Sequence, residues 1–186
     1  MINLNEEQYE NKNVKIFNGG EAGQVKGVTL TVSKKASTDK ENAPDYKVIV
    51  TDVSGAEINK AFYKGFTDWK DSRLTFFVKE MKHLIGVVGV EAPKEIASYD
   101  ALLELAMKTV ATNAKGKKFN VAVSYGTLDR PSKYLGINSC FAIGDATSTP
   151  YIGKNPQMTR VEPDEIIVTG EQGSEDTGGD DLPWGN

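Results

Sequence analysis

The spacing of apolar residues changes twice along this chain of 186 residues, and this limits the folds open to it. In residues 14–64, short runs such as 28–32 alternate apolar and polar residues, which is the period of a strand with one buried face. Between residues 71 and 113 apolar residues recur every three or four positions, the period of a helix face. Alternation returns at 119–125, and 134–143 is again typical of extended chain. The pattern predicts an α+β protein that is mainly β with a helical insertion.

The boundaries of these elements follow from turn and cap signals. We expect strands at 14–17, 25–32, 46–52, 58–64, 119–125 and 134–143, with the turn 53–56 joining 46–52 and 58–64 in a hairpin. The first helix is expected to begin at Asp71 or Ser72 and to end near Gly86–Gly89, and the second to run from an N-cap at Ser98 to Asn113. This order suits a small closed or partly closed five-stranded barrel with two helices before its fourth strand, and the oligonucleotide-binding fold fits it best.

The last 25 residues differ from the rest in charge. Eight carboxylates fall in residues 162–186, and no Lys or Arg follows Arg160. So polar a segment cannot bury a core, and we expect it to be a disordered acidic tail. It would follow a nucleic-acid-binding domain at 1–144 and an extended arm at 145–161 that is rich in Thr, Ser, Pro and Gly.

The charge of the remaining chain is reversed. Although the whole chain carries −4, residues 1–161 hold 22 basic against 18 acidic residues, about +4. A basic body joined to an acidic tail indicates a surface for a polyanion, for which the tail can compete through the same cationic side chains.

The tail ends in a short acidic and apolar tip, formed by Asp180, Asp181, Leu182, Pro183 and Trp184. Such a segment is typical of a linear motif that docks into an apolar pocket with a basic rim. The tip resembles that of bacterial and phage single-stranded DNA-binding proteins, which is typically two or three Asp, an aliphatic residue, Pro and a terminal Phe. Here Trp184 replaces the Phe and Gly185-Asn186 follow it, so a pocket that clamps a terminal carboxylate beside the ring would not match.

The order of elements, together with the tail, also resembles phage early proteins regarded as single-stranded DNA-binding proteins. The resemblance implies a body that coats single-stranded DNA in replication, recombination or repair, and a tip that recruits the proteins of these processes. It also implies a location in the cytoplasm of the host. The N-terminus lacks the basic start and apolar core of a signal peptide, and no stretch has the length of a membrane span, so we expect a cytoplasmic protein without membrane contact.

A site for single-stranded DNA needs cations along the phosphates and aromatic faces on which bases stack. Aromatic and basic residues interleave most densely at Lys60, Phe62, Tyr63, Lys64, Phe66, Trp69, Lys70 and Arg73. Phe62 or Tyr63 can instead fill the core, whereas Trp69 lies among charged loop residues and is the first choice for stacking. Three further clusters are expected to border the groove: Lys26, Lys34, Lys35 and Lys40 around the first loop, Lys115, Lys117 and Lys118 before the fourth strand, and Arg130, Lys133 and Tyr134 near the last loop.

Enzymatic activity is not expected. The carboxylates Asp39, Glu41, Asp45, Asp52 and Glu57 are scattered without a metal-binding motif. His83 and Cys140 are the only residues of their kinds, so we expect no catalytic residue, metal or cofactor. The alternative function is a phage protein-interaction or virion-associated module with the same barrel and a merely solubilising tail.

Overall fold

The computed structural model describes residues 15–161. The expected acidic tail and its tip at Asp180–Trp184 lie outside the described residues, as do residues 1–14. The chain folds in the order η2 (Phe17–Gly20), β1 (Gly23–Lys34), β2 (Tyr46–Thr51), β3 (Glu57–Phe62), α1 (Asp71–Val87), α2 (Tyr99–Asn113), β4 (Phe119–Thr127), β5 (Arg130–Gly136), η3 (Cys140–Ala142) and β6 (Ile143–Asp145). The predicted α+β class with a helical insertion is confirmed.

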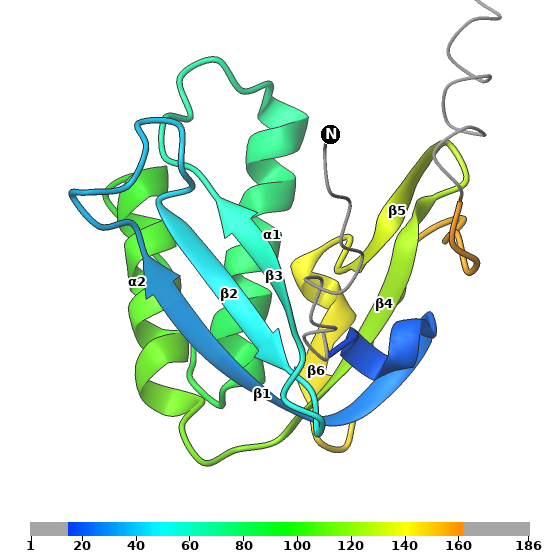
Figure 1. Ribbon diagram of the computed structural model, residues 1–186. Helices are drawn as coiled ribbons and strands as arrows, with labels where there is room; N and C mark the ends of the chain where they lie inside the picture. Colours follow the sequence, from blue (N-terminus) through cyan, green and yellow to red (C-terminus); the bar gives the residue numbers. More distant parts are fainter. Residues whose placement is uncertain (1–14, 162–186) are drawn as a thin grey trace, which may run out of the picture.

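The six strands form one antiparallel sheet in the order β3-β2-β1-β4-β5, with β6 also paired to β4. β1 joins the two halves of the sheet, because its first half pairs with β4 and its second half with β2. The register shifts between Lys26 and Val28, where Gly27 has a φ of 74°. Such a bulge lets a strand bend, and β1 curves along the base of the molecule between the two halves (Figure 1).

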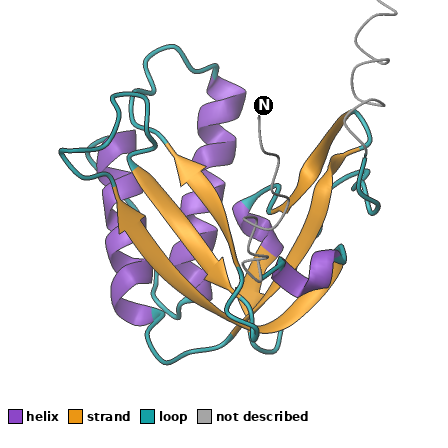
Figure 2. Cartoon of the chain, viewed as in Figure 1, coloured by secondary structure: helices purple, strands orange, loops and turns teal. Residues whose placement is uncertain are grey.

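The helices begin and end close to where their periodicity predicts. The Ser98 side chain caps α2 by accepting a hydrogen bond from the Ala101 amide at 3.1 Å. Both helices lie behind β1, β2 and β3 in the views of Figures 1 and 2, and cover one face of these strands. Val28, Val48 and Val50 of the strands are fully buried with Met81, Leu84, Leu103 and Met107 of the helices.

The predictions of a strand at 14–17 and of one strand at 134–143 are wrong. The described part of 14–17 leads into the 3-10 turn η2, because Asn18, Gly19 and Gly20 take the left-handed backbone with φ of 47°, 61° and 83°. The run 134–143 is divided among β5, η3 and β6. It breaks where the amide of Cys140 donates a hydrogen bond of 2.7 Å to Oε1 of buried Glu80, which fixes η3 to α1.

The sheet stays open between β3 and β5, so of the closed or partly closed barrel that was expected, the closed form is not present. The two edge strands nevertheless approach within 8 Å between Cα atoms. Lys60 of β3 donates a hydrogen bond of 2.9 Å from Nζ to the Asn138 carbonyl, just beyond β5. One side chain therefore bridges the gap that a strand ladder would close.

The arm after β6 packs against β4. Asn120 donates hydrogen bonds from Nδ2 to the Ala146 and Ser148 carbonyls at 3.0 and 2.9 Å. The Tyr125 amide donates to the Gln157 carbonyl at 2.8 Å. As a result β4 is buried on both faces from Phe119 to Tyr125. None of the helices within residues 15–161 has the length and apolar character needed to cross a membrane.

Candidate nucleic-acid interface

The outer face of β3, β2 and β1, on the side away from the helices, is largely polar. Three rows of paired residues cross it: Ser33, Lys47 and Ala61; Thr31, Ile49 and Asn59; Thr29, Thr51 and Glu57. All nine are exposed or half-buried. Most are small or polar, so a flexible chain can lie across the strands without meeting a bulky side chain.

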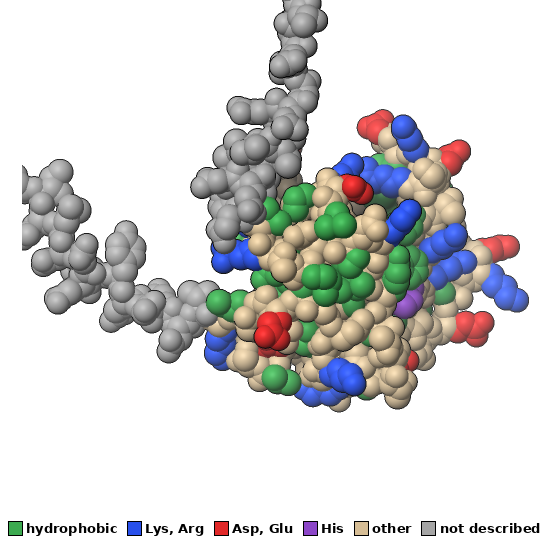
Figure 3. Space-filling model, turned by 90° about the vertical axis from the view of Figure 1, so that its right-hand side faces the viewer, with side chains coloured by type: hydrophobic (Ala, Val, Ile, Leu, Met, Phe, Trp, Pro, Cys, Tyr) green, Lys and Arg blue, Asp and Glu red, His purple; other side chains and the backbone are tan. Residues whose placement is uncertain are grey.

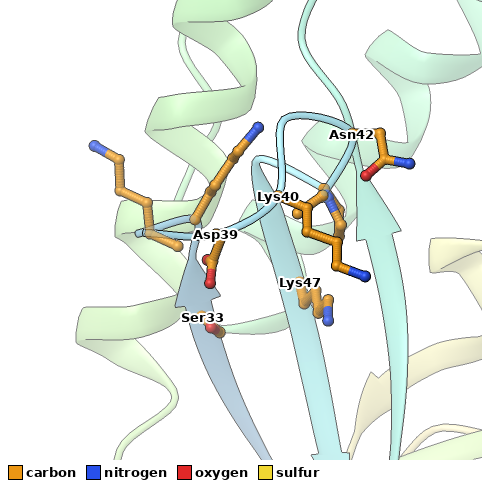
Figure 4. A pocket seen from close by; sticks show the side chains of 9 residues that line it. Ser33, Asp39, Lys40, Asn42 and Lys47 are labelled. Atoms are coloured by element: carbon orange, nitrogen blue, oxygen red, sulfur yellow. The ribbon is translucent and has the colours of Figure 1, made fainter. Parts of the chain in front are cut away.

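A loop at residues 35–45 joins β1 to β2 at one end of this face, and we call it the basic loop. Its shape comes from short turns, in which the Ala43 amide donates to the Lys40 carbonyl and the Lys35 amide to the Asp45 carbonyl, both at 2.9 Å. The loop and the adjacent strand ends surround a hollow of about 320 Å³ (Figure 4).

The hollow is strongly cationic. Four lysines line it, Lys34, Lys35, Lys40 and Lys47, against one carboxylate, Asp39. Asp39 accepts a hydrogen bond of 2.8 Å from the Ala36 amide, which holds it within its own turn. Lys40 and Lys47 reach the hollow from different elements, the loop and β2 (Figure 4).

Lys47 was missed by the sequence analysis. It alternates with buried Tyr46 and Val48, which was enough to place it on the polar face of the strand. Because it stands alone between apolar residues, it did not stand out as part of a basic cluster. Only the turn of the basic loop brings Lys40 to the same hollow.

The interleaved stretch at 60–73 divides between core and surface. Phe62 and Phe66 are buried in the core, where neither ring face is open to a ligand. Tyr63 follows β3 directly and is 53% exposed, so its ring is accessible to a ligand at the end of this strand.

Trp69 is half-buried and belongs to an aromatic cluster. Its ring centroid lies 4.9 Å from that of Phe66 and 5.9 Å from that of Phe77, with edge-to-face geometry in both pairs. The Arg73 guanidinium covers the ring, with its central carbon 3.6 Å from the centroid. A base could stack on Trp69 only after Arg73 moved away.

The cations of the same stretch are partly engaged. Lys64 forms an ion pair with Glu104 of α2, and the hydrogen bond to that carboxylate raises the pKa of Lys64. Lys60 is held by the Asn138 carbonyl. Lys70 and Arg73 are exposed at the start of α1.

Tyr134 is the other accessible aromatic among the predicted site residues, at 70% exposure. It lies where the pairing of β5 with β4 is irregular. Gly126 pairs with Pro131 and Ser124 with Gly136, so between these two pairs β5 is five residues long and β4 only two. The Lys133 ammonium lies 5.1 Å from the centroid of the Tyr134 ring. Gly126 makes this packing possible, because a Cβ there would lie 2.3 Å from the Arg130 carbonyl oxygen.

The predicted basic clusters do not form one continuous border. The basic loop and the β4–β5 hairpin that carries Arg130 lie on either side of the molecule, at upper left and upper right in Figure 1. Lys118 directly precedes Phe119, the first residue of β4, which pairs with Val28 of β1. Val28 lies about 20 Å along β1 from Lys34, so Lys118 is far from the basic loop. Lys26 is exposed and lines a separate hollow with Lys15.

The described residues carry a surplus of unpaired positive charge. Residues 15–161 contain 21 Lys and Arg against 15 Asp and Glu. Within this range Lys64–Glu104 is the one ion pair, so none of the other cations has a carboxylate of the same range within ion-pair distance.

The groups that could support catalysis are engaged in structure. Burial raises the pKa of the Cys140 thiol well above its usual value, with the nearby Glu80 carboxylate adding to the effect. His83 donates from Nε2 to the Ile143 carbonyl at 2.7 Å. Within residues 15–161 no three His, Cys, Asp or Glu side chains gather in a way that could hold a metal ion.

Compared with known proteins, the chain matches no family model, no curated protein and no solved structure.

Proposed function

We propose that this protein binds single-stranded DNA without sequence preference, on the outer face of β3, β2 and β1, with the basic loop holding the phosphates. The role would be to protect the strand during replication, recombination or repair. The protein acts without catalysis, metal or cofactor, in the cytoplasm of a phage-infected cell.

The hollow of the basic loop carries the proposal. Of the four lysines that line it, Lys35 donates from Nζ to the Glu41 carbonyl and the Lys34 ammonium lies over the Tyr46 ring. Lys40 and Lys47 have no carboxylate within ion-pair distance among the described residues, so an anion in the hollow would offset the repulsion between their charges. A phosphate backbone supplies such charges in series and releases its own counterions on binding. The surplus of cations elsewhere on the described residues supports the same ligand class.

The outer face fits a single strand better than a duplex. Tyr63 offers a ring for base stacking beside a row of small polar side chains. Stacking on an aromatic ring does not depend on base identity, and duplex bases have no free face. Tyr134, with Lys133 against its ring, offers a second stacking position near the β4–β5 hairpin.

The arrangement of strands supports a partly open barrel of the oligonucleotide-binding type. The first strand pairs with the second and the fourth, the third lies near the fifth, and the helices come between the third and the fourth. Domains of this type bind ligands on their second and third strands and on the loops between strands one and two and between four and five. The basic loop and the β4–β5 hairpin are the corresponding loops here.

The tip at Asp180–Trp184 would recruit replication or recombination proteins. Its leucine and tryptophan would enter an apolar pocket of the partner, and its two aspartates would meet a basic rim.

A titration of the full chain with fluorescent oligothymidine at two salt concentrations tests the proposal. We expect affinity to fall steeply with salt, and Lys40→Glu with Lys47→Glu to weaken binding roughly tenfold or more at low salt and to lower the salt slope by about 1.4. Lys94→Glu with Lys108→Glu makes the same change in charge at two exposed lysines that do not line the hollow, and should leave binding close to that of the unmodified protein. Absence of salt-dependent binding, or equal effects of the two variants, would refute the proposal.

One observation favours the alternative, a protein-interaction or virion-associated module. Apolar side chains gather on the face that carries β4, β5 and the arm (Figure 3). Leu128, Tyr151 and Met158 of these elements are 63%, 57% and 46% exposed. Exposed apolar patches mark protein contacts. The oligothymidine titration separates the two functions, because a protein-interaction module has no reason to bind it.

A further inference from the structure

Another hollow on the body differs from that of the basic loop in having an apolar floor beside its lysines. It lies along α1, where Leu74 and Val78 face Tyr99 at the start of α2, and has a volume of about 440 Å³. Lys79 and Lys82 line the same hollow, with Asp71 as its one carboxylate. We call it the α1 groove.

The floor of the α1 groove is apolar and firmly supported. Leu74 and Val78 are half-buried against the core, one helical turn apart on one side of α1. The Tyr99 ring packs against Phe66 and Phe77, with centroids 5.8 and 6.5 Å apart, and remains 40% exposed. The groove is therefore formed before any ligand arrives, which lowers the cost of binding.

We propose that the α1 groove binds the C-terminal tip of the same molecule. Leu182 and Trp184 would lie on Leu74, Val78 and Tyr99, and Asp180 and Asp181 would lie toward Lys79 and Lys82. This inference concerns the chain's own tip and does not depend on DNA binding.

The tip and the α1 groove match in charge and in apolar character. The tip places two carboxylates directly before an apolar pair, and the groove places two ammonium groups beside an apolar floor. The basic loop also attracts carboxylates, but its hollow is lined mainly by lysines and polar residues and gives a tryptophan ring little to pack against.

The tip can reach the groove within one molecule. Residues 162–179 separate the last described residue from the tip, and these 18 residues span at most about 60 Å. A body of this size has a radius of gyration of about 15 Å. A tether of this length gives an effective concentration on the order of millimolar, so a groove with weak intrinsic affinity is still occupied.

The consequence is control of recruitment. The groove lies on the helical layer and the proposed DNA face on the opposite side of the sheet, so a docked tip leaves that face open. A partner protein would have to compete with the α1 groove for the tip.

The test uses the full chain labelled with 5-fluorotryptophan and observed by fluorine NMR. The chain has two tryptophans, so Trp184→Phe assigns the resonances of Trp69 and Trp184. A labelled peptide of residues 174–186 supplies the position of the undocked tip. At low salt we expect the Trp184 resonance of the full chain to differ from that of the peptide and to be independent of protein concentration.

Paired charge reversals locate the contact. Lys79→Glu with Lys82→Glu should reduce occupancy roughly tenfold and move the Trp184 resonance to that of the peptide, because each exposed attraction becomes a repulsion. Lys40→Glu with Lys47→Glu should leave it in place, and an unchanged Trp69 resonance shows that either variant is folded. The assignment is overturned if Trp184 matches the peptide in the unmodified chain or if both pairs shift it equally. A concentration-dependent shift would also overturn it, by placing the tip on a second molecule. Oligothymidine binding of the same samples reports on the proposed function separately.

Discussion

β4 and the three-stranded group β3-β2-β1 belong to one sheet but differ in what covers them. β4 is buried on both faces over seven consecutive residues, Phe119 to Tyr125. In β2 buried residues alternate with half-buried ones, and in β3 exposed residues alternate with half-buried ones up to buried Phe62. The helices cover one face of this group, and its other face carries no described helix or strand.

The difference separates structural residues from those available for binding. The polar side chains of β4, such as Asn120 and Ser124, are satisfied within the protein. Those of the outer face, such as Asn59 and Thr31, remain exposed. Substitutions in β4 should therefore affect stability, and substitutions around the outer face should affect binding.

The largest effect is expected in β4. Phe119 is 1% exposed, and Phe119→Ala should lower the free energy of unfolding by about 3–5 kcal/mol, because it leaves a cavity that the core cannot fill. Ile49→Ala on the half-buried outer face should cost clearly less, as measured by urea denaturation. Equal losses would show that the outer face is covered in solution.

Two aromatic residues allow a sharper comparison. Tyr63→Ala should weaken oligothymidine binding by about 1–3 kcal/mol and leave stability nearly unchanged. Trp69→Ala should instead lower stability by roughly 2 kcal/mol, since its ring packs on Phe66 and Phe77, and should change binding less. The reverse pattern in titration and denaturation would restore Trp69 as the stacking residue and show that Arg73 moves aside.

Removing the acidic tail tests whether its carboxylates compete with DNA for the cationic face. Removal of residues 162–186 should tighten oligothymidine binding several-fold at low salt, and the gain should shrink as salt rises. Removal of Trp184–Asn186 alone keeps all eight carboxylates and should hardly change DNA affinity. Equal affinity of the full chain and the 1–161 chain at low salt would contradict competition by the tail.

The smallest effect concerns Asp52 at the end of β2. Burial raises the pKa of this carboxyl, but hydrogen bonds from Ser54 and from the Asn18 and Ala56 amides outweigh it and lower the pKa below 3.8. Because the folded pKa is the lower one, the stabilisation is present above about pH 4 and is lost as the pH falls through the folded value. The free energy of unfolding of the Asp52→Asn variant should fall less between pH 7 and about pH 3 than that of the unmodified protein. Identical losses in denaturation at the two pH values would remove Asp52 as a source of acid sensitivity.

Much of the fold could be predicted from periodicity. The alternation of Val28, Leu30 and Val32 predicted β1, and the spacing of three and four predicted both helices. Periodicity failed at η2, where Asn18 and the two following glycines override the strand pattern of Val14–Phe17. It also failed at 134–143, because a contact between Cys140 and Glu80, 60 residues apart, turns the chain.

The site was predicted in part for the same reason. Lysines close in sequence, such as Lys34 and Lys35, could be grouped, but Lys47 joins them only through the fold. Trp69 has charged neighbours in sequence and aromatic neighbours in space. Sequence neighbours predicted an exposed ring, and tertiary neighbours cover it.

The sequence by itself determined the places of β1 to β4 and of both helices, the side of β1 that enters the core, and the separation of a basic body from an acidic tail. The positions of strands and helices depend on the spacing of apolar residues within a short stretch, and the charge of each part is a sum over its residues. The tertiary structure alone decided that β4 is covered twice, that the sheet stays open between β3 and β5, and that four lysines share one hollow. Each of these depends on which distant segments pack together, and packing is a property of pairs of segments that no single stretch of sequence contains.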